Sequence, residues 1–301
     1  GTRVAIIGGG SSGLCAIKAC LQEGLVPVCF ERSGDIGGLW RFEEHPDEGR
    51  ASIYKSVIIN TSKEMMCFSD FPIPDDFPNY MHNSKIMEYF RMYAQHFDLL
   101  RYIRFRVSTA GPGGAGCPGQ WDVVTESGGE QESAVFDAVL VCTGHHTNAH
   151  LPLHTFPGIE KFKGRYLHSR DYKDPQAFKD KRVIVIGIGN SGSDLAVEIS
   201  QTAKQVFLST RRGAWILNRV GDQGYPIDII LTTRMKTFLS KLLTPSMVSD
   251  WAEKRLNERF DHSHYGLKPK HRCLQTLPFA QEKRPPGSPF IQTSSGGGMM
   301  S

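Results

Sequence analysis

The 301-residue sequence lacks long hydrophobic runs and lacks concentrated charge of one sign. No apolar run approaches the roughly 18 residues that span a bilayer, so we expect no transmembrane helix within the chain. The first residues show neither the charged region nor the apolar region of a secretory signal, so none is expected. With 35 basic and 31 acidic residues, the net charge is only +4. This balance, without Lys/Arg blocks, argues against a nucleic-acid partner.

Paired cysteines are also missing. The seven cysteines are odd in number and scattered, several of them in apolar segments, which is typical of reduced thiols in a core. None forms a CxxC pair, and no His/Cys cluster has the spacing of a zinc site. The sequence therefore predicts neither a disulfide framework nor a bound metal. The cysteines are Cys15, Cys20, Cys29, Cys67, Cys117, Cys142 and Cys273.

The sequence does contain a glycine-rich turn directly after its first apolar run, at residues 3–7. Gly8 would allow a tight turn, Gly10 would let the backbone approach a pyrophosphate, and Gly13 would permit close packing of the following helix. The free N–H groups at the start of that helix would face the phosphates. The full turn is Gly8, Gly9, Gly10, Ser11, Ser12 and Gly13.

A glycine turn alone is weak evidence, because such turns also occur simply to reverse the chain. Here a helical pattern covers residues 14–23, an apolar strand covers residues 26–30, and Glu31 closes that strand. An acid at this place accepts hydrogen bonds from the adenosine ribose. The combination favours a dinucleotide site over a plain turn.

Two further stretches are candidates for cofactor contact. Residues 34–40 form a second glycine cluster that ends in Leu39 and Trp40. A flexible surface turn is one interpretation, but the two bulky side chains would be unfavourable in water, which favours a wall against a planar ligand. The apolar run at residues 53–59 is interpreted as a strand whose end carries Asn60. The Asn60 amide could cap a local turn, or it could bind a flavin or nicotinamide ring.

The middle of the chain predicts a helix followed by short strands. Apolar residues in 84–97 recur at helical spacing and are expected to face the core. Strands are expected at residues 102–105, 120–124 and 136–142, with a loose glycine-rich hairpin tip at residues 111–119.

The opening pattern then recurs. Residues 182–186 form an apolar strand, a glycine turn and a helix follow, and residues 205–209 form the next strand. Instead of an acid, Arg211 and Arg212 follow that strand and suit a ribose 2′-phosphate, so the second nucleotide is predicted to be NADP. A solvated basic turn is the alternative for one of the two arginines. The second turn contains Gly187, Gly189, Asn190, Ser191 and Gly192.

The last third of the chain predicts helices and then a tail. Apolar residues among basic ones at 227–260 predict one or two amphipathic helices, split at Pro245, that pack mainly in the core. A membrane-surface or substrate-entry role is the minority interpretation, motivated by the flanking Arg234, Lys236 and Lys241. Residues 273–301 are rich in Pro, Gly and Ser and are predicted to be disordered.

Together these motifs resemble the flavin-containing monooxygenases. The resemblance rests on the two glycine turns, on residues 34–40 and 60–66, and on an FxGxxxHxxxY pattern from Phe162 to Tyr172, and it covers about residues 1–272. It implies an α/β fold with two Rossmann-like units, the second inserted in the first. The implied domains are the N-terminal part of an FAD-binding domain at 1–150, an incomplete NADP-binding domain at 151–272 and a divergent tail at 273–301. The C-terminal part of the family pattern is expected to be missing.

The resemblance also implies an activity. FAD would bind to the first unit and NADP(H) to the second, and reduced FAD would take up O₂ as a C4a-hydroperoxyflavin. The family oxygenates soft nucleophiles such as N- or S-containing xenobiotics, or inserts oxygen into ketones in Baeyer–Villiger reactions. The partners would be a small lipophilic substrate and O₂. The family's location is the cytosolic face of the endoplasmic reticulum (microsomal) membrane, although its hydrophobic anchor is not expected here.

The family's site residues carry over by motif. Asn60 would lie where the flavin and nicotinamide rings meet and is the catalytic candidate. FAD would contact Gly8, Gly9, Gly10, Ser11, Ser12, Glu31, Leu39, Trp40, Asn60 and Thr61. NADP would contact Ile59, Asn60, Ser191, Gly192, Ser193 and Asp194.

Other functions stay in view. A flavin disulfide reductase would need a redox cysteine pair near the flavin, and the sequence contains no CxxC pair. A plain NADPH oxidase or reductase, and a shortened non-catalytic chain that keeps its nucleotide-binding turns, are the remaining alternatives.

Overall fold

The computed structural model describes residues 1–115 and 119–273. The chain forms two compact units, of which the first comprises Gly1–Ile58 and Met81–Lys173. The second comprises Ile59–Tyr80 and the residues from Asp174 onward. Each unit is a group of residues that pack mainly with one another, and the two units do not coincide with the predicted cofactor domains. The predicted domain boundary at residue 150 stays a prediction. The predicted disordered tail lies, beyond Cys273, outside the described residues.

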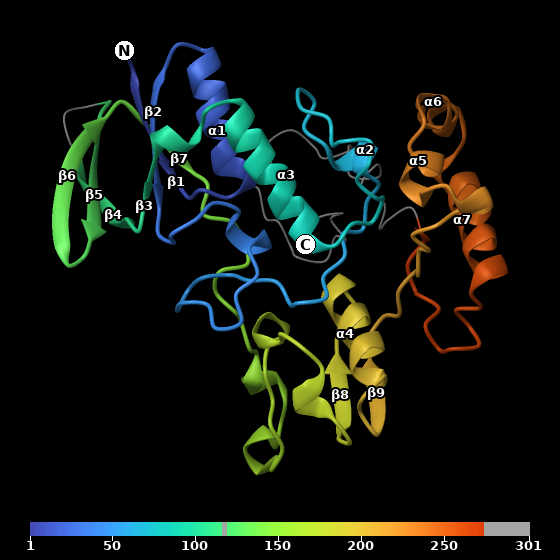
Figure 1. The fold of residues 1–301 in the computed structure, drawn as a ribbon. Helices are drawn as coiled ribbons and strands as arrows, with labels where there is room; N and C mark the ends of the chain where they lie inside the picture. Colours follow the sequence, from blue (N-terminus) through green and yellow to red (C-terminus); the bar gives the residue numbers. More distant parts are fainter. Residues whose placement is uncertain (116–118, 274–301) are drawn as a thin grey trace. The chain divides into compact units, whose positions relative to one another are not determined.

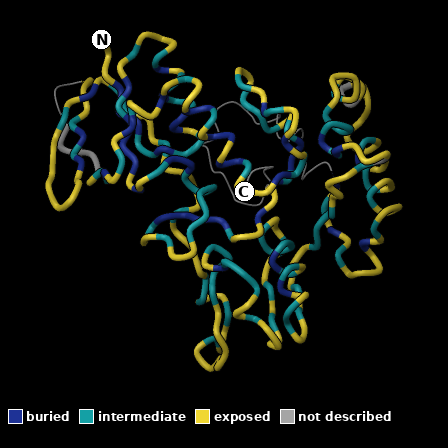
Figure 2. The backbone as a smooth tube through the Cα atoms, viewed as in Figure 1, coloured by how far each residue is buried: buried dark blue, intermediate teal, exposed yellow. Residues whose placement is uncertain are grey.

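A parallel four-stranded sheet with the order β3-β2-β1-β7 organises the first unit (Figure 1). Its strands are β1 (Arg3–Ile7), β2 (Val26–Glu31), β3 (Ile103–Phe105) and β7 (Ala138–Val141). The central strand β1 is an apolar run because the inner strands of parallel sheets are buried on both faces. Ala5 and Ile6 are fully buried there. Figure 2 shows buried residues along this sheet.

Two helices accompany this sheet. Helix α1 (Ser11–Gln22) connects β1 to β2 and fully buries Leu14 and Ile17. Burial of each such side chain contributes about 1.5–3 kcal/mol relative to exposure. Helix α3 (Asn83–His96) buries the apolar stripe that the sequence predicts, including Ile86, Tyr89, Phe90 and Tyr93. The expected core-facing helix is therefore confirmed.

An antiparallel three-stranded meander follows β3, with the order β4-β5-β6. Its strands are β4 (Ser108–Ala115), β5 (Trp121–Ser127) and β6 (Glu130–Phe136). The prediction of a loose tip at residues 111–119 is wrong as far as Ala115, because β4 continues past Pro112 with register shifts. The predicted strand at 136–142 is interrupted, since β6 and β7 belong to different sheets. At the single residue between them, the Asp137 N–H donates to the Arg3 carbonyl (2.9 Å) and its carboxylate accepts from the Arg3 N–H (2.7 Å).

The predicted strand at residues 53–59 does not form. Within it only Ile58 makes an isolated bridge, to His82, and a turn closes where the Val57 N–H donates to the Tyr54 carbonyl (3.2 Å). The apolar residues are nevertheless buried, with Ile53, Val57 and Ile59 each less than 10% exposed. The apolar residues of this run therefore indicate burial but not a strand, because its backbone groups form hydrogen bonds with partners other than a neighbouring strand.

The second unit contains the predicted second βαβ arrangement. Strand β8 (Arg182–Ile186) leads through a turn into α4 (Asn190–Ser200) and on to β9 (Gln205–Ser209). The strands are parallel and form a two-stranded sheet in the described part of the chain. Ile184 and Ile186 are 64% and 63% exposed on it. The local element order is therefore as the sequence predicts, but one face of this sheet is largely uncovered.

The remaining helices belong to the second unit: α2 (Lys63–Met66), α5 (Ile227–Leu231), α6 (Arg234–Leu242) and α7 (Pro245–Arg259). The predicted break at Pro245 is correct, but three helices occupy residues 227–260. The prediction that their apolar residues pack in the core is wrong for Phe238, Leu242 and Trp251, which are 59%, 68% and 51% exposed. Among the described residues, no helix has the length and apolar character needed to cross a membrane.

Candidate functional site

The first glycine turn, between β1 and α1, has a geometry that only glycine satisfies. Gly8 adopts φ = +108°, and a Cβ there would lie 2.5 Å from the carbonyl oxygen of Cys142. A Cβ at Gly13 would lie 1.9 Å from the carbonyl oxygen of Gly8. The turn therefore needs the conformational freedom of the first glycine and the missing side chain of the last.

The start of α1 is open. Gly10 is the N-cap, and because it has no side chain, the first helical turn has no side-chain cap from that residue. A Cβ at Gly10 would meet nothing nearer than the Cα of Gly38, at 3.7 Å. The first N–H groups of a helix lack intrahelical partners and carry partial positive charge. With Ser11 and Ser12 as its first residues, this end fits the pyrophosphate of a dinucleotide.

Glu31 is held firmly beside the turn. Its Oε2 accepts from the Gly9 N–H (2.6 Å), and its Oε1 accepts from the Ser33 N–H and hydroxyl (2.7 Å each). The residue is only 9% exposed. The sequence predicts a ribose contact alone, whereas the structure shows that this carboxylate also shapes the turn. Each carboxylate oxygen can accept more than one hydrogen bond, so a ribose hydroxyl can still bind.

The second glycine cluster packs directly on the first turn. The Gly37 N–H donates to the Gly9 carbonyl (3.1 Å), and a Cβ at Gly38 would lie 3.3 Å from the Cα of Gly10. The short 3₁₀ turn Gly38–Trp40 follows, and Leu39 and Trp40 are half-buried. We call residues 38–41 the wall segment, because they border the open end of α1.

The second unit contains a turn of the same design. Gly187 has φ = +105°, and a Cβ at Gly192 would lie 2.2 Å from the Gly187 carbonyl oxygen. Gly189 caps α4 without any side-chain hydrogen bond to the first turn. The Ser193 hydroxyl lies within hydrogen-bonding distance of the Gly189 and Asn190 carbonyls (3.0 Å each). The first N–H groups of α4 are therefore as open to a phosphate as those of α1.

Arg211 and Arg212 lie just beyond the end of β9, at the edge where the second turn begins. The Gly187 N–H donates to the carbonyl of Ser209, the last residue of β9 (2.9 Å). Both arginines are exposed, and in the described part of the chain neither guanidinium has a protein partner. Two free cations beside a glycine turn suit a phosphate on the adenosine ribose.

Asn60 lies in the second unit and is oriented by an arginine. Its Oδ1 accepts from Nε (3.0 Å) and Nη2 (2.8 Å) of Arg219. Nη2 of Arg219 also lies 3.7 Å from Oδ1 of Asp194, in the first turns of α4. One guanidinium thus joins two predicted NADP contacts. Because the amide oxygen is occupied, the Asn60 amide nitrogen is the group left to donate to a ligand.

The predicted residues divide between the two units. The first unit holds the first turn, Glu31, Leu39 and Trp40. The second unit holds the second turn with Ser193 and Asp194, the two arginines, and also Ile59, Asn60 and Thr61. Two further arginines contact the predicted site residues and are not predicted by the sequence: Arg50, which donates to the Gly38 carbonyl, and Arg219, which donates to Asn60. A single arginine in an irregular segment has no spacing pattern that would single it out.

Comparisons with known proteins agree with this geometry. The family model described as flavin-binding monooxygenase-like matches residues 1–287. Flavin-containing monooxygenase 5 of Oryctolagus cuniculus is 67% identical over 95% of this chain and 54% of its own length. Within the family, residues 71–74, 145–150 and 213–219 resemble those of flavin-containing monooxygenase 5 in particular. The identity to the Oryctolagus cuniculus protein confirms this resemblance. Dimethylaniline monooxygenase [N-oxide-forming] 2 of Cavia porcellus is 55% identical over 94% of this chain and 54% of its own length.

Among solved structures, the S-allyl-L-cysteine S-oxygenase from Allium sativum superposes with a TM-score of 0.65 and 28% identity. The match covers 74% of this chain and 54% of that protein. The chain therefore spans about half the length of the relatives it matches. The predicted α/β fold and the predicted FAD and NADP(H) agree with this family. The chain belongs to the flavin-binding monooxygenase-like family.

Proposed function

We propose that the protein is part of an NADPH- and FAD-dependent monooxygenase that transfers one oxygen atom of O₂ to a small lipophilic substrate. The observation that carries the proposal is the duplicated turn. Gly13 and Gly192 each fit against a carbonyl oxygen of their own turn, and each turn opens a helix whose N-cap is a glycine and so provides no side-chain cap. Two such cradles in one chain of this family suit two dinucleotides.

The residues divide the binding task in two. FAD fits the first unit, with its pyrophosphate at Gly10–Ser12, its ribose at Glu31 and its ring against Leu39 and Trp40. NADP fits the second unit, with its pyrophosphate at the second turn and its 2′-phosphate at Arg211 and Arg212. Bound FAD, once reduced by NADPH, would supply the activation of O₂. The chain's own residues bind and orient both nucleotides.

Asn60 is the residue we assign to the reacting rings. Its oxygen is fixed by Arg219, so its amide N–H groups keep a set direction from which to donate to a nicotinamide or flavin carbonyl. This arrangement would hold the position of the ring that Asn60 contacts during hydride transfer.

The substrates are nitrogen- or sulfur-containing compounds in the first instance. The Cavia porcellus relative is named as N-oxide-forming and the Allium sativum protein as an S-oxygenase. Insertion of oxygen into ketones is the alternative chemistry. The whole enzyme would act at the cytosolic face of the endoplasmic reticulum membrane, as the family resemblance implies.

An absorption spectrum of the purified chain from about 300 to 500 nm, before and after NADPH in air, tests the proposal. We expect flavin bands that bleach with NADPH and return while a sulfide substrate gains oxygen. A colourless chain that does not take up added FAD would contradict the proposal. Oxidation of NADPH without any oxygenated product would indicate an oxidase.

Matched variants locate the two nucleotides. Gly13→Ala places a Cβ against the Gly8 carbonyl and should abolish flavin binding. Gly192→Ala makes the same clash in the second turn and should leave the flavin bands while abolishing their reduction by NADPH. Equal loss of flavin in both variants would contradict the assignment of FAD to the first turn.

A further inference from the structure

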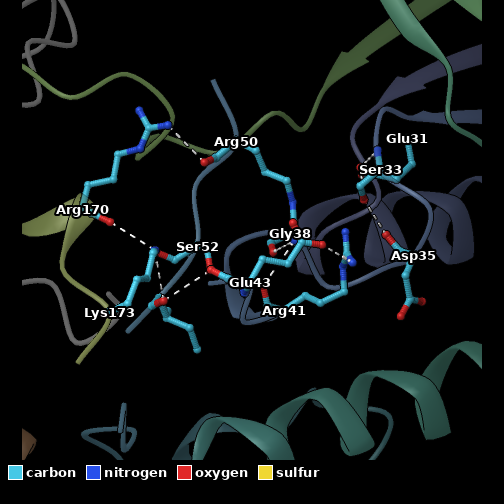
Figure 3. Close-up of polar contacts among 11 residues, drawn as sticks. Glu31, Ser33, Asp35, Gly38, Arg41, Glu43, Arg50, Ser52, Arg170 and Lys173 are labelled. Carbon is cyan, nitrogen blue, oxygen red and sulfur yellow. Dashed lines mark hydrogen bonds and ion pairs between the residues drawn. The ribbon is translucent and has the colours of Figure 1, made fainter. Parts of the chain in front are cut away.

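A short segment of the first unit is buried although it forms neither helix nor strand. Arg50, Ala51, Ser52 and Ile53 are each between 4% and 8% exposed. Buried backbone groups outside regular structure need hydrogen-bond partners from elsewhere, because an unpaired one is costly. We call residues 50–53 the buried segment. Its partners lie on two sides, and Figure 3 shows them.

On one side the buried segment holds the wall segment. Nη2 of Arg50 donates to the carbonyls of Gly38 (3.4 Å) and Arg41 (3.3 Å), and the Ile53 N–H donates to the Leu39 carbonyl (3.3 Å). Three of the four carbonyls of residues 38–41 are thereby fixed. Glu43 forms ion pairs with both Arg50 and Arg41, and its N–H donates to the Ser52 hydroxyl (2.9 Å). The conformation of the wall segment therefore depends on the position of the buried segment.

On the other side, two cations hold the buried segment: Arg170, within the FxGxxxHxxxY pattern, and Lys173, directly after it. Nη2 of Arg170 donates to the Arg50 carbonyl (3.1 Å). Nζ of Lys173 donates to the carbonyls of Ser52 (3.1 Å), Ile53 (3.4 Å) and Arg170 (3.2 Å). A lysine ammonium has three donors, and here all three have carbonyl partners. Burial, with Arg170 and Arg50 nearby, lowers the pKa of Lys173, while Asp171 acts in the opposite direction.

These contacts connect three segments in series, because Arg170 and Lys173 hold the buried segment and the buried segment holds the wall segment. We call this series of hydrogen bonds the relay. Two of the three Lys173 donors and Nη2 of Arg170 reach carbonyls of the buried segment, which general packing alone would not require. Within that segment, Arg50 and Ile53 in turn donate to the carbonyls of Gly38, Leu39 and Arg41. The relay therefore ends at the half-buried side chains of Leu39 and Trp40.

We propose that Lys173 and Arg170 are positioning residues for the flavin site, which hold Leu39 and Trp40 in place through the buried segment. The inference rests on the proposed function, because the contact of Leu39 and Trp40 with the flavin ring belongs to that proposal. It adds a task for residues 170–173, at the end of the FxGxxxHxxxY pattern, namely to fix the wall against which the flavin ring lies.

The test uses the full chain with Lys173→Met, which keeps the aliphatic stem and removes the three donors. Lys161→Met, at an exposed lysine of the same unit, is the control, and Lys173→Arg is the conservative rescue. Two quantities are measured: amide hydrogen exchange of peptides covering residues 38–53 without FAD, and the Kd for FAD by quenching of flavin fluorescence. For Lys173→Met we expect faster exchange and a Kd raised on the order of tenfold, as for loss of charged hydrogen bonds. Lys161→Met should match the wild type, and Lys173→Arg should recover at least part of the affinity.

The two readouts separate the outcomes. Unchanged exchange in Lys173→Met would overturn the inference whatever the affinity for FAD. Faster exchange with an unchanged Kd would also overturn it, because the relay would then hold the wall segment without affecting the binding of FAD. Failure of the wild-type chain to bind FAD would overturn the proposed function, and the flavin role of the relay with it. If Lys173→Met does not fold by circular dichroism, Arg170→Gln carries the same expectation, since it removes the bond to the Arg50 carbonyl.

Discussion

His262 shows how neighbouring groups fix the protonation of a single residue. Its Nε2 lies 2.9 Å from the Ile216 N–H and must accept that hydrogen bond. Its Nδ1 lies 2.9 Å from Oδ1 of Asn257 and must therefore carry the proton. The side chain is fully buried, and burial lowers the pKa of His262 below 6.5, although the Phe260 backbone and Asp261 act against this shift. The neutral imidazole is the form that fits.

This geometry predicts that acid destabilises the second unit. Because the folded pKa lies below the unfolded one, the unfolded chain binds more protons as the pH falls below about 6.5, and the free energy of unfolding decreases there. Urea unfolding followed by tryptophan fluorescence between about pH 7.5 and 5.5 measures the effect. His262→Gln can still accept from Ile216 but cannot titrate, so its dependence on pH should be shallower. Equal slopes in the two proteins would contradict the prediction.

Arg211 and Arg212 make a second prediction at the residue scale. Their free guanidinium groups can each form charged hydrogen bonds to a 2′-phosphate, which NADH lacks. The double change to Ala should raise the Kd for NADPH on the order of tenfold or more and leave NADH binding nearly unchanged. Lys204→Ala, at the opposite end of β9, is the control and should change neither. Equal weakening of NADPH and NADH would show that the arginines do not read the 2′-phosphate.

At the scale of elements, α6 and the start of α7 expose a run of large apolar side chains. They are Met235, Phe238, Leu239, Leu242, Leu243, Met247 and Trp251, each at least 44% exposed. The exposed Arg234 and Lys236 accompany them on α6. Apolar side chains next to basic ones are typical of helices that lie on anionic membrane surfaces. The minority interpretation of the sequence therefore gains support from the exposure of these side chains.

We expect the chain to bind vesicles that contain phosphatidylserine, less strongly at high salt and less strongly to neutral vesicles. Phe238→Glu with Leu242→Glu should reduce the bound fraction severalfold in a vesicle flotation assay. Val197→Glu, at a residue of α4 that is 64% exposed, is the matched control and should bind as the wild type does. Binding that is unaffected by the double change would exclude this helix face.

How far the sequence predicts each element depends on the range of the interactions that form it. The two βαβ starts are correct because a glycine turn, an apolar run and a helical stripe are all local signals. Residues 53–59 are predicted as a strand, and the prediction is wrong because backbone groups of Ile53 and Lys55 bond to Lys173, more than 100 residues away, and not to a neighbouring strand. The ribose role of Glu31 stays a prediction, while its bonds to Gly9 and Ser33 could be seen only in three dimensions. The expected core packing of residues 227–260 fails because the helical spacing of apolar residues does not reveal what covers them.

At the scale of the whole molecule, both parallel sheets end in exposed strands within the described residues. Among the strands that the structure describes, β7 borders only β1 and β8 borders only β9. Val141, at the end of β7, is 75% exposed. Strand edges with apolar side chains can pair with other strands. The relatives are about twice as long as this chain. The nucleotide-binding turns therefore find their packing partners within this chain, whereas both parallel sheets keep unpaired edges.

The pairing of Arg3 with Asp137 also sets the timing of folding during synthesis. The two residues are 134 positions apart, and the neighbouring β7 pairs in register with β1. At the roughly 5–20 residues per second of translation, β1 waits on the order of ten seconds before β7 leaves the ribosome. Until then β1 can pair only with β2, and its other edge is free. Of the strands in this sheet, β1 is thus the one that a chaperone would have to shield longest.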